Sequence, residues 1–230
     1  MDIAIIPARG GSKRIPRKNV KSFCGKPMIY YSIKAALEFY DFDQVIISTD
    51  DDEIRDIGIS LGAKVPFKRP QNLADDLTPT VPVIRHAILE CEKLGWNINL
   101  VCCIYATAPF LDIRDLRRAK TLTCRSHNVY SFPVCEYSSP IQRALGLNSD
   151  GTVNPLFPDN ELCRTQDLKK TCFDVGQFYF ARKNTWLTQD NIHQNGQGVM
   201  IPKWRAIDID DEDDWTMAEK MFYSQYISSN

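Results

Sequence analysis

Short segments that are apolar at nearly every position most strongly limit the folds open to this chain of 230 residues. Three such runs, at 3–8, 44–49 and 99–105, are rich in Ile, Val and Leu and are too short for typical helices. A strand whose side chains are all apolar belongs to a sheet that is covered on both faces, as parallel sheets are. The sequence therefore predicts one α/β domain over 1–230, with a mostly parallel central sheet and helices on both faces.

Amphipathic helical segments separate the apolar runs, as the alternation in such a fold requires. After Pro27, the apolar residues Ile29, Ile33 and Leu37 recur at helical spacing. We expect one of the three aspartates at 50–52 to cap the next helix. Further helices are predicted around 54–61, 81–91, 113–122 and 215–222, and further strands at 62–65, 128–134 and 176–181.

The segment at 136–171 interrupts this alternation. Three prolines and two glycines punctuate it, and its apolar residues are dispersed along the segment. Apolar residues such as Leu145, Val153 and Phe157 nevertheless favour ordered hairpins over a disordered insertion. We interpret the segment as an inserted arm that packs against a second subunit.

The first apolar run opens directly into a basic loop at 9–19. The pair Gly10-Gly11 leaves backbone N–H groups free to turn toward a bound anion. Five cationic side chains in the loop can hold a polyphosphate; they are Arg9, Lys13, Arg14, Arg17 and Lys18. A solvated basic turn is the alternative, but a glycine pair directly after a first strand favours phosphate binding. Ligands in such sheets bind beyond the carboxyl ends of the strands, where this loop lies.

Two common nucleotide-binding patterns are missing from this loop. A P-loop ends in Gly-Lys-Ser or Gly-Lys-Thr, whereas the Gly-Lys pair in this sequence is followed by Pro27. The Gly-x-Gly-x-x-Gly pattern does not follow the first strand. Ordinary kinases, GTPases and nicotinamide dehydrogenases are therefore disfavoured, and a phosphate-binding loop of another kind remains.

Asp208 and Asp210 form the second chemical feature, because they alternate with the apolar residues Ile207 and Ile209. Side chains two residues apart on a strand end point to the same side, so we expect the two carboxylates to converge. Mg²⁺ prefers such oxygen ligands and completes its coordination with water and substrate phosphates. The aspartates and glutamate at 211–214 are better explained as the negatively charged start of a helix.

Composition excludes several other classes of protein. The 28 basic and 29 acidic residues balance, so bulk electrostatic binding to nucleic acid is not expected. The start of the sequence does not resemble a signal peptide, and no apolar stretch approaches the roughly 20 residues that span a bilayer. We therefore expect a soluble, cytoplasmic protein that does not bind membranes.

The eight cysteines lack metal-binding spacing, and Cys102 and Cys103 suit reduced core thiols.

Taken together, these segments resemble the acylneuraminate cytidylyltransferases, the enzymes that make CMP-activated nonulosonic acids. The segment 6–19 resembles the signature loop of that family. The similarity continues through 45–50, through Arg69-Pro70 with 73–76, and through 207–210, and so covers nearly the whole chain.

Within this family the chain looks most similar to the pseudaminic acid branch, on the segments 102–111, 140–145 and 174–179. Tyr105 and Val175 stand where sialic acid enzymes typically carry Gln and Asn. Phe173 stands where His is expected in the pseudaminic acid branch.

The resemblance implies a Rossmann-like nucleotidyltransferase in which CTP and a nine-carbon keto-acid sugar, here pseudaminic acid, give the CMP-sugar and pyrophosphate. It implies catalytic roles for Arg9 and Lys18, which would hold the triphosphate, and for Asp208 and Asp210, which would bind Mg²⁺. The implied nucleotide-binding residues are Ala8, Arg9, Gly10, Gly11, Ser12, Lys13, Lys18, Asn19, Arg69, Thr78 and Thr80. The implied sugar-binding residues are Tyr105, Gln142, Arg143, Arg164, Asp167 and Gln177, with Arg143 or Arg164 pairing with the sugar carboxylate. The resemblance also implies a homodimer in which arm residues cross the subunit interface and contribute to the partner's pocket.

Three other readings compete with this one. A legionaminic or N-acetylneuraminic acid cytidylyltransferase would keep the reaction and change the sugar. A catalytically silent protein that binds sugar nucleotides would keep only the fold. Retention of both the basic loop and the aspartate pair argues against the silent protein. A nucleic-acid-binding module is disfavoured by the charge balance.

Overall fold

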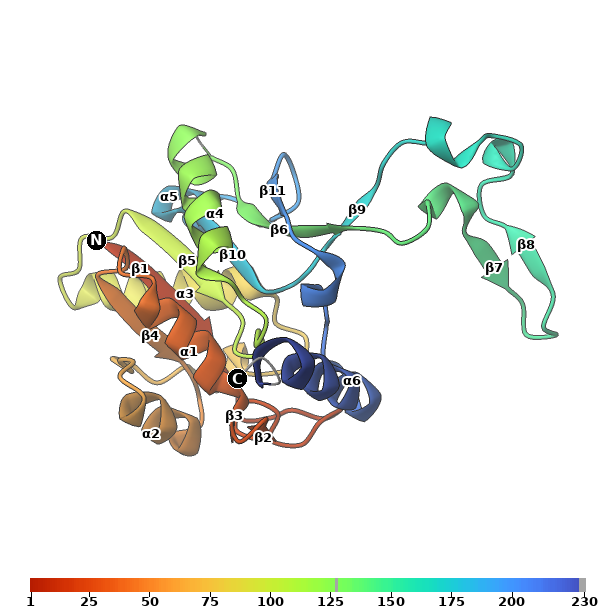
Figure 1. The fold of residues 1–230 in the computed structure, drawn as a ribbon. Helices are drawn as coiled ribbons and strands as arrows, with labels where there is room; N and C mark the ends of the chain where they lie inside the picture. The colour runs from red at the N-terminus through yellow and green to blue at the C-terminus, as the bar shows by residue number, and fades with distance from the viewer. Residues whose placement is uncertain (127, 228–230) are drawn as a thin grey trace.

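A twisted central sheet organises the computed structural model, which describes residues 1–126 and 128–227 (Figure 1). Within these residues the sheet has seven strands, in the order β11-β6-β10-β5-β1-β4, with β9 paired to β6. The strands are β1 (Asp2–Pro7), β4 (Gln44–Ser48), β5 (Leu100–Ile104), β6 (Ser131–Glu136), β9 (Cys172–Asp174), β10 (Phe178–Arg182) and β11 (Gln197–Met200).

Most strands of the sheet run in one direction. β1 is parallel to both β4 and β5, with Ile5 opposite Ile46 on one side and Cys103 on the other. β11 is parallel to β6. β10 lies antiparallel between β5 and β6, and β9 is antiparallel to β6. The predicted mostly parallel sheet is therefore confirmed, with β10 and β9 reversed.

Helices cover both faces of the sheet, as the apolar strands predict. Ala4 and Ile6 of β1 belong to one apolar core, which packs against α1, α2 and α4. Ile3 and Ile5 point to the opposite face and pack in a second core with α3 and α5. The helices are α1 (Met28–Glu38), α2 (Asp52–Ser60), α3 (Thr80–Lys93), α4 (Ile113–Arg125), α5 (Lys183–Thr188) and α6 (Glu212–Phe222). No helix within the described ranges is long and apolar enough to cross a membrane.

A third apolar cluster fixes the basic loop and the aspartate pair to the body of the protein. Ile15 of the loop and Ile209 of the aspartate segment are both buried in it, beside Trp215 and Phe222 of α6. The ring of Phe23, from the short hairpin β2 (Ser22–Phe23) and β3 (Lys26–Pro27), packs edge-on against both of these aromatic side chains. Two segments almost 200 residues apart are thereby held at the same edge of the sheet.

Helix capping follows the sequence prediction. Asp51 caps α2 by accepting a hydrogen bond from the Ile54 amide at 2.9 Å. Asp211 caps α6 in a capping box with Asp214, which confirms that the acidic stretch begins a helix.

Three predicted strands differ from the structure. The segment 62–65 contributes only one bridge, between Lys64 and Ile46, because Pro66 lacks the N–H group needed to continue the pairing. The strand predicted at 128–134 begins at Ser131. Asp208 and Asp210 lie on an extended segment that belongs to no strand. A short 3₁₀ turn, Lys203–Arg205, precedes this segment and separates it from the sheet.

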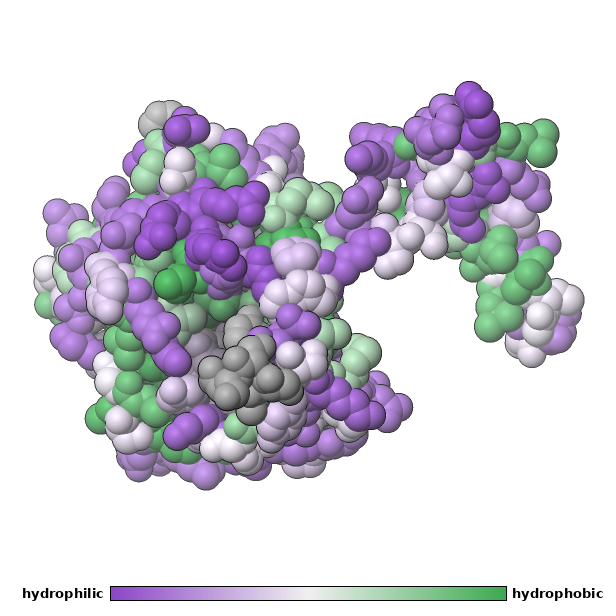
Figure 2. All heavy atoms as spheres, in the orientation of Figure 1, coloured by the Kyte–Doolittle hydropathy of each residue, from purple (hydrophilic) through white to green (hydrophobic). Residues whose placement is uncertain are grey.

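The segment after β6 forms an arm that projects from the body and returns through β9 (Figure 1). It contains the hairpin of β7 (Leu145–Leu147) and β8 (Val153–Pro155), joined to the body by short 3₁₀ turns. Apolar side chains gather at this hairpin on the surface of the arm (Figure 2). Leu147 is 75% exposed and Leu156 is 58% exposed, so the arm leaves an apolar surface uncovered in a single chain.

Candidate active site

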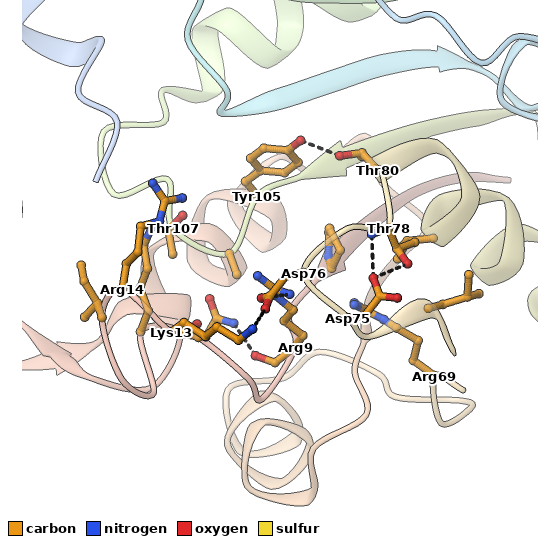
Figure 3. A pocket seen from close by; sticks show the side chains of 18 of the residues that line it. Arg9, Lys13, Arg14, Arg69, Asp75, Asp76, Thr78, Thr80, Tyr105 and Thr107 are labelled. Carbon is orange, nitrogen blue, oxygen red and sulfur yellow. Dashed lines mark hydrogen bonds and ion pairs between the residues drawn. The ribbon is translucent and has the colours of Figure 1, made fainter. Parts of the chain in front are cut away.

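A cavity of about 330 Å³ opens at the carboxyl ends of β1 and β5 (Figure 3). Its walls come from the basic loop after β1, the loop at 69–78, the first turns of α3 and the segment after β5. Asp210 adds a carboxylate from the far end of the chain. The cavity therefore lies at the sheet edge where the topology predicts a ligand.

The basic loop is held in place by its own backbone and by the turn after β4. Asn19 donates a hydrogen bond from Nδ2 to the Arg9 carbonyl at 2.9 Å, closing the loop on itself. The Gly10 amide donates to Asp50 Oδ1 at 3.1 Å. A Cβ atom at Gly10 would lie 2.6 Å from Asp51 Oδ2, so a side chain at this position would push the loop away from α2.

Arg17 serves this anchoring and does not line the cavity. Its backbone adopts a left-handed conformation, with φ of 56°. The guanidinium binds both oxygens of Asp51, at 2.6 and 3.0 Å, and also contacts Glu53. The hydrogen bonds from Arg17 lower the pKa of Asp51 to about 2. The sequence prediction that all five cations face a polyphosphate is thus wrong for Arg17, because the acidic start of α2 binds it.

The other four cations face the cavity, and each contacts a carboxylate. Arg9 and Lys13 bind the two oxygens of Asp76, at 2.6 and 2.5 Å (Figure 3). Arg14 lies 2.6 Å from Asp210 Oδ2, and Lys18 lies 3.7 Å from Oδ1. A ligand with several negative charges would find four donors already gathered on one loop.

Lys18 and Asp208 have shifted pKa values that describe the electrostatics of this end of the cavity. Partial burial lowers the pKa of Lys18, and the carboxylates of Asp210 and Asp208 oppose that shift. Partial desolvation, followed by repulsion from Asp210, raises the pKa of Asp208, although part of its side chain remains exposed. The two carboxylates thus repel each other, and a cation bound between them would relieve that repulsion.

The donor chemistry of Asp208 and Asp210 fits Mg²⁺. Both present hard carboxylate oxygens, and the phosphates of a substrate could complete an octahedral shell. Among the described residues, no group of three or more His, Cys, Asp or Glu side chains gathers as a metal site. A metal bound here would therefore depend on the two aspartates together with water and substrate oxygens.

Beyond the basic loop, the cavity is also lined by polar side chains that are held by hydrogen bonds. Arg69 is 5% exposed and donates to Ser48 Oγ at 3.1 Å. Burial lowers the pKa of Arg69 to about 10. Thr78 is fixed by Asp75, which accepts from its amide and from its hydroxyl, both at 2.7 Å. Arg69 and Thr78 are therefore held in fixed orientations where they line the cavity.

Most of the predicted nucleotide and metal residues meet at this one cavity. The lining includes Arg9, Ser12, Lys13, Lys18, Asn19, Arg69, Thr78, Thr80, Tyr105 and Asp210. Ala8, Gly10 and Gly11 belong to the same loop as Arg9, and Asp208 lies beside Asp210 along the chain; none of these four lines the cavity.

Most of the predicted sugar-binding residues lie outside this cavity. Gln142, Arg143, Arg164 and Asp167 all lie on the arm and none lines the cavity. Gln142 and Arg143 instead border a concave surface of about 450 Å³ on the arm itself. Gln177 is buried and donates from Nε2 to the Arg205 carbonyl at 2.7 Å. A single chain therefore brings Tyr105 alone of these six to the cavity.

Asp76 is the main site residue that sequence reasoning missed. Its segment, 73–76, contributes to the family resemblance, but the sequence predicts no role for Asp75 or Asp76. The sequence signal for Asp76 is the pair of adjacent acids, Asp75-Asp76, because the cationic loop needs acidic partners elsewhere in the chain. The sequence places Arg14 in the basic loop, but its contact with Asp210, almost 200 residues away, leaves no local signal.

Comparison with known proteins agrees with the geometry of this cavity. Residues 3–202 match the family model described as cytidylyltransferase. The chain is 40% identical to the pseudaminic acid cytidylyltransferase of Campylobacter jejuni subsp. jejuni serotype O:2, over 96% of each protein. It is 29% identical to the CMP-N,N'-diacetyllegionaminic acid synthase of Legionella pneumophila subsp. pneumophila, over 95% of each.

Solved structures show the same fold. The CMP:2-keto-3-deoxy-manno-octonic acid synthetase complexed with CTP superposes with a TM-score of 0.69, at 15% identity, over 98% of this chain and 100% of that one. The family resemblance drawn from the sequence is confirmed by these matches. The chain belongs to the cytidylyltransferase family of nucleotidyltransferases.

Proposed function

We propose that this enzyme transfers the cytidylyl group of CTP to pseudaminic acid, giving CMP-pseudaminic acid and pyrophosphate. The convergence of four loop cations and Asp210 on one cavity carries the proposal, because it matches the charge of a triphosphate and its metal ion. The 40% identity to the Campylobacter jejuni enzyme over 96% of each protein supports pseudaminic acid as the sugar. The cytoplasm, where CTP is available, is the proposed place of action.

The proposed reaction is a displacement at the α-phosphorus of CTP. The anomeric hydroxyl oxygen of the sugar forms the new bond to phosphorus, and the bond to the β-phosphate oxygen breaks. The hydroxyl proton passes from the attacking oxygen to solvent water, and pyrophosphate departs with the bonding electron pair. Such a reaction depends mainly on alignment and on neutralising charge around the phosphorus.

Different residues of the cavity would serve alignment and charge neutralisation. Arg9 and Lys18 would hold the triphosphate and stabilise the charge that develops during displacement. Ser12, Lys13 and the backbone around Gly10-Gly11 would bind the β- and γ-phosphates. Asp208 and Asp210 would hold Mg²⁺, which neutralises phosphate oxygens when it is bound. Asn19, Arg69 and Thr78 would bind the nucleoside.

We further propose that the enzyme is a homodimer whose arms complete the sugar sites. The arm carries four of the predicted sugar residues but holds them away from the cavity of its own chain. Its exposed apolar side chains, including Leu147 and Leu156, would be covered by a second copy. Arg143 or Arg164 could then reach the sugar carboxylate bound in the other subunit.

Pyrophosphate release tests the proposal directly. The enzyme would be incubated with CTP, Mg²⁺ and pseudaminic, legionaminic or N-acetylneuraminic acid in parallel. We expect turnover with pseudaminic acid at least tenfold faster than with the other two. Faster turnover with legionaminic acid would support cytidylyl transfer but show that pseudaminic acid is not the substrate. Binding of CTP without turnover of any sugar would point instead to a silent binding protein.

A further inference from the structure

A buried ion pair holds the chain just before the proposed metal aspartates. Arg205 Nη1 lies 2.5 Å from Asp115 Oδ2, and the two residues are only 7% and 3% exposed. Arg205 stands three residues before Asp208, in the segment that runs from β11 to α6 (Figure 1). Charged side chains are rarely buried this deeply unless they are paired, so the contact fixes Arg205 against α4.

Two further residues of α4 and its cap complete this anchor. Asp112, the N-cap of α4, places its Oδ2 atom 3.6 Å from Arg205 Nη1. Arg118 Nη1 lies 3.3 Å from Asp115 Oδ1 and donates to the Met200 carbonyl at 3.0 Å. Both oxygens of Asp115 are therefore bound, and α4 is tied to the end of β11 as well as to the turn that follows it. The anchor thus holds Arg205 against the body of the protein.

Gln177 holds Arg205 from a second direction, through the main chain. The residue is 4% exposed, lies directly before β10, and donates from Nε2 to the Arg205 carbonyl at 2.7 Å. The Gln177 carbonyl accepts from the Tyr105 amide at 2.9 Å, and Tyr105 lines the cavity, whereas Gln177 does not. Arg205 is thus fixed at its side chain by α4 and at its carbonyl by Gln177.

The position of the aspartates depends on anchors at either end of their segment. Residues 206–210 belong to no helix or strand. Beyond Arg205, the chain is next fixed at Ile209, which is 1% exposed in the third apolar cluster. Two residues separate Arg205 from Asp208, so a displacement of the Arg205 main chain is passed on to Asp208 through fixed covalent geometry. Like charges would also move apart if the segment were loose.

From these contacts we infer that Gln177 is a positioning residue for the aspartate pair. Together with the buried Arg205–Asp115 pair, it fixes where the two carboxylates meet a divalent cation bound with CTP. Gln177 supports a carbonyl behind the cavity and does not touch the substrate in this role. The inference rests on the proposed function, and it gives Gln177 a different task from the sugar binding that the family resemblance implies.

Gln177→Met tests the inference, because methionine has a similar length and cannot donate a hydrogen bond. Calorimetry would compare the Kd of CTP in Mg²⁺ with the Kd in a chelator, without any sugar. With Mg²⁺ the Kd should rise about tenfold in the variant, while with the chelator it should change less than about twofold. Gln189→Met is the matched control, since Gln189 Nε2 also donates to a main-chain carbonyl, that of Asn128 at 2.8 Å, and does not line the cavity.

Initial rates distinguish the positioning role from a sugar-binding role. In Gln177→Met the KM for Mg²⁺ should rise about tenfold, while kcat at saturating Mg²⁺ and the KM for pseudaminic acid change less than about twofold. A higher KM for pseudaminic acid with an unchanged KM for Mg²⁺ would overturn the inference and favour sugar binding. Equal Kd values for CTP in wild type and Gln177→Met with Mg²⁺ present would overturn it as well.

Arg205→Lys is a second variant that keeps the inference testable if Gln177→Met does not fold. Lysine keeps the buried charge facing Asp115 but lacks the fixed fork of the guanidinium, so CTP binding in Mg²⁺ should weaken in the same way. The calorimetric measurement needs no turnover and therefore separates this inference from the proposed function. Weakened binding in Mg²⁺, in a protein that turns over no sugar, would support the positioning role while the proposed function failed. Turnover of pseudaminic acid with an intact Mg²⁺ effect in both variants would overturn the inference alone.

Discussion

Arg9 and Asp76 form an ion pair of 2.6 Å inside the cavity, and Lys13 binds the other oxygen of the same carboxylate. Asp76 thus sits between two cations, where a phosphate group with two free oxygens would fit equally well. A triphosphate that uses Arg9 and Lys13 must first displace this carboxylate. The loop that carries Asp76 is therefore expected to move when CTP binds.

Asp76→Asn should strengthen CTP binding, because the competing charge is removed. Both partners are about one-third exposed, so the gain is expected to be modest, about two- to fivefold in Kd. Calorimetric titration with CTP measures it. Asp75→Asn is the neighbouring control and should not tighten binding, since Asp75 holds Thr78 and contacts no loop cation. An unchanged Kd in Asp76→Asn would show that the carboxylate does not compete.

Asp210→Asn should reduce kcat by at least a hundredfold, because an amide cannot supply the charge needed to bind Mg²⁺. Asp208→Asn should weaken turnover in the same direction. Initial rates of pyrophosphate release at several Mg²⁺ concentrations measure the effect. Asp213→Asn, in the first turn of α6, is the control and should leave the rate unchanged. Near-normal kcat for Asp210→Asn at high Mg²⁺ would contradict the assigned metal site.

Arg17→Met should destabilise the fold without removing a cavity-lining group. Because Arg17 is 40% exposed, the expected loss in free energy of unfolding at pH 7 is about 1 kcal/mol. Arg55→Met offers a control, since its partners Asp52 and Asp56 are largely exposed and its contribution should be smaller.

The loss caused by Arg17→Met should also depend on pH. Arg17 lowers the pKa of Asp51 to about 2 in the folded protein. A depressed carboxyl pKa stabilises the fold above the unfolded pKa of about 4 and loses that effect as pH falls toward 2. The difference between wild type and Arg17→Met should therefore be constant from pH 7 to pH 5 and shrink below pH 4. Denaturant titrations across this range measure it, and a difference that grew on acidification would contradict the pairing.

Leu147→Asp should convert the proposed dimer to a monomer, because it places a charge on the exposed apolar surface of the arm. Light scattering coupled to size exclusion reports the mass. Turnover should fall with the dimer if the arm completes the sugar site of a second subunit. Leu94→Asp changes an exposed leucine at the end of α3 and serves as the control. If the wild type were a monomer, or if the Leu147→Asp monomer were active, the arm could not complete the sugar site of a second subunit.

Local sequence signals predicted the features that depend on neighbouring residues. The apolar runs fixed the two-sided sheet because Ile3 and Ile5 face one core while Ala4 and Ile6 face the other. The cap at Asp51 and the acidic start of α6 followed from short-range hydrogen bonding. The basic loop was placed correctly because a buried first strand leads directly into it.

Features set by distant partners could not be predicted in the same way. The reversed direction of β10 depends on the arm that precedes it, since the chain returns along β9 before β10 begins. Arg17 has the same sequence character as Arg9, and only the position of α2 draws it away from the cavity. In the proposed dimer, the roles of Gln142 and Arg143 would depend on a second chain, and the local sequence pattern carries no information about that chain.

The products formed from CTP and pseudaminic acid test the central claim most directly. Phosphorus NMR of the reaction mixture distinguishes attack at the α-phosphorus from attack at the γ-phosphorus. We predict equal amounts of pyrophosphate and a CMP-sugar phosphodiester, with both lost in Asp210→Asn. Formation of CDP with a phosphorylated sugar, or of orthophosphate without a CMP-sugar, would contradict cytidylyl transfer at this cavity.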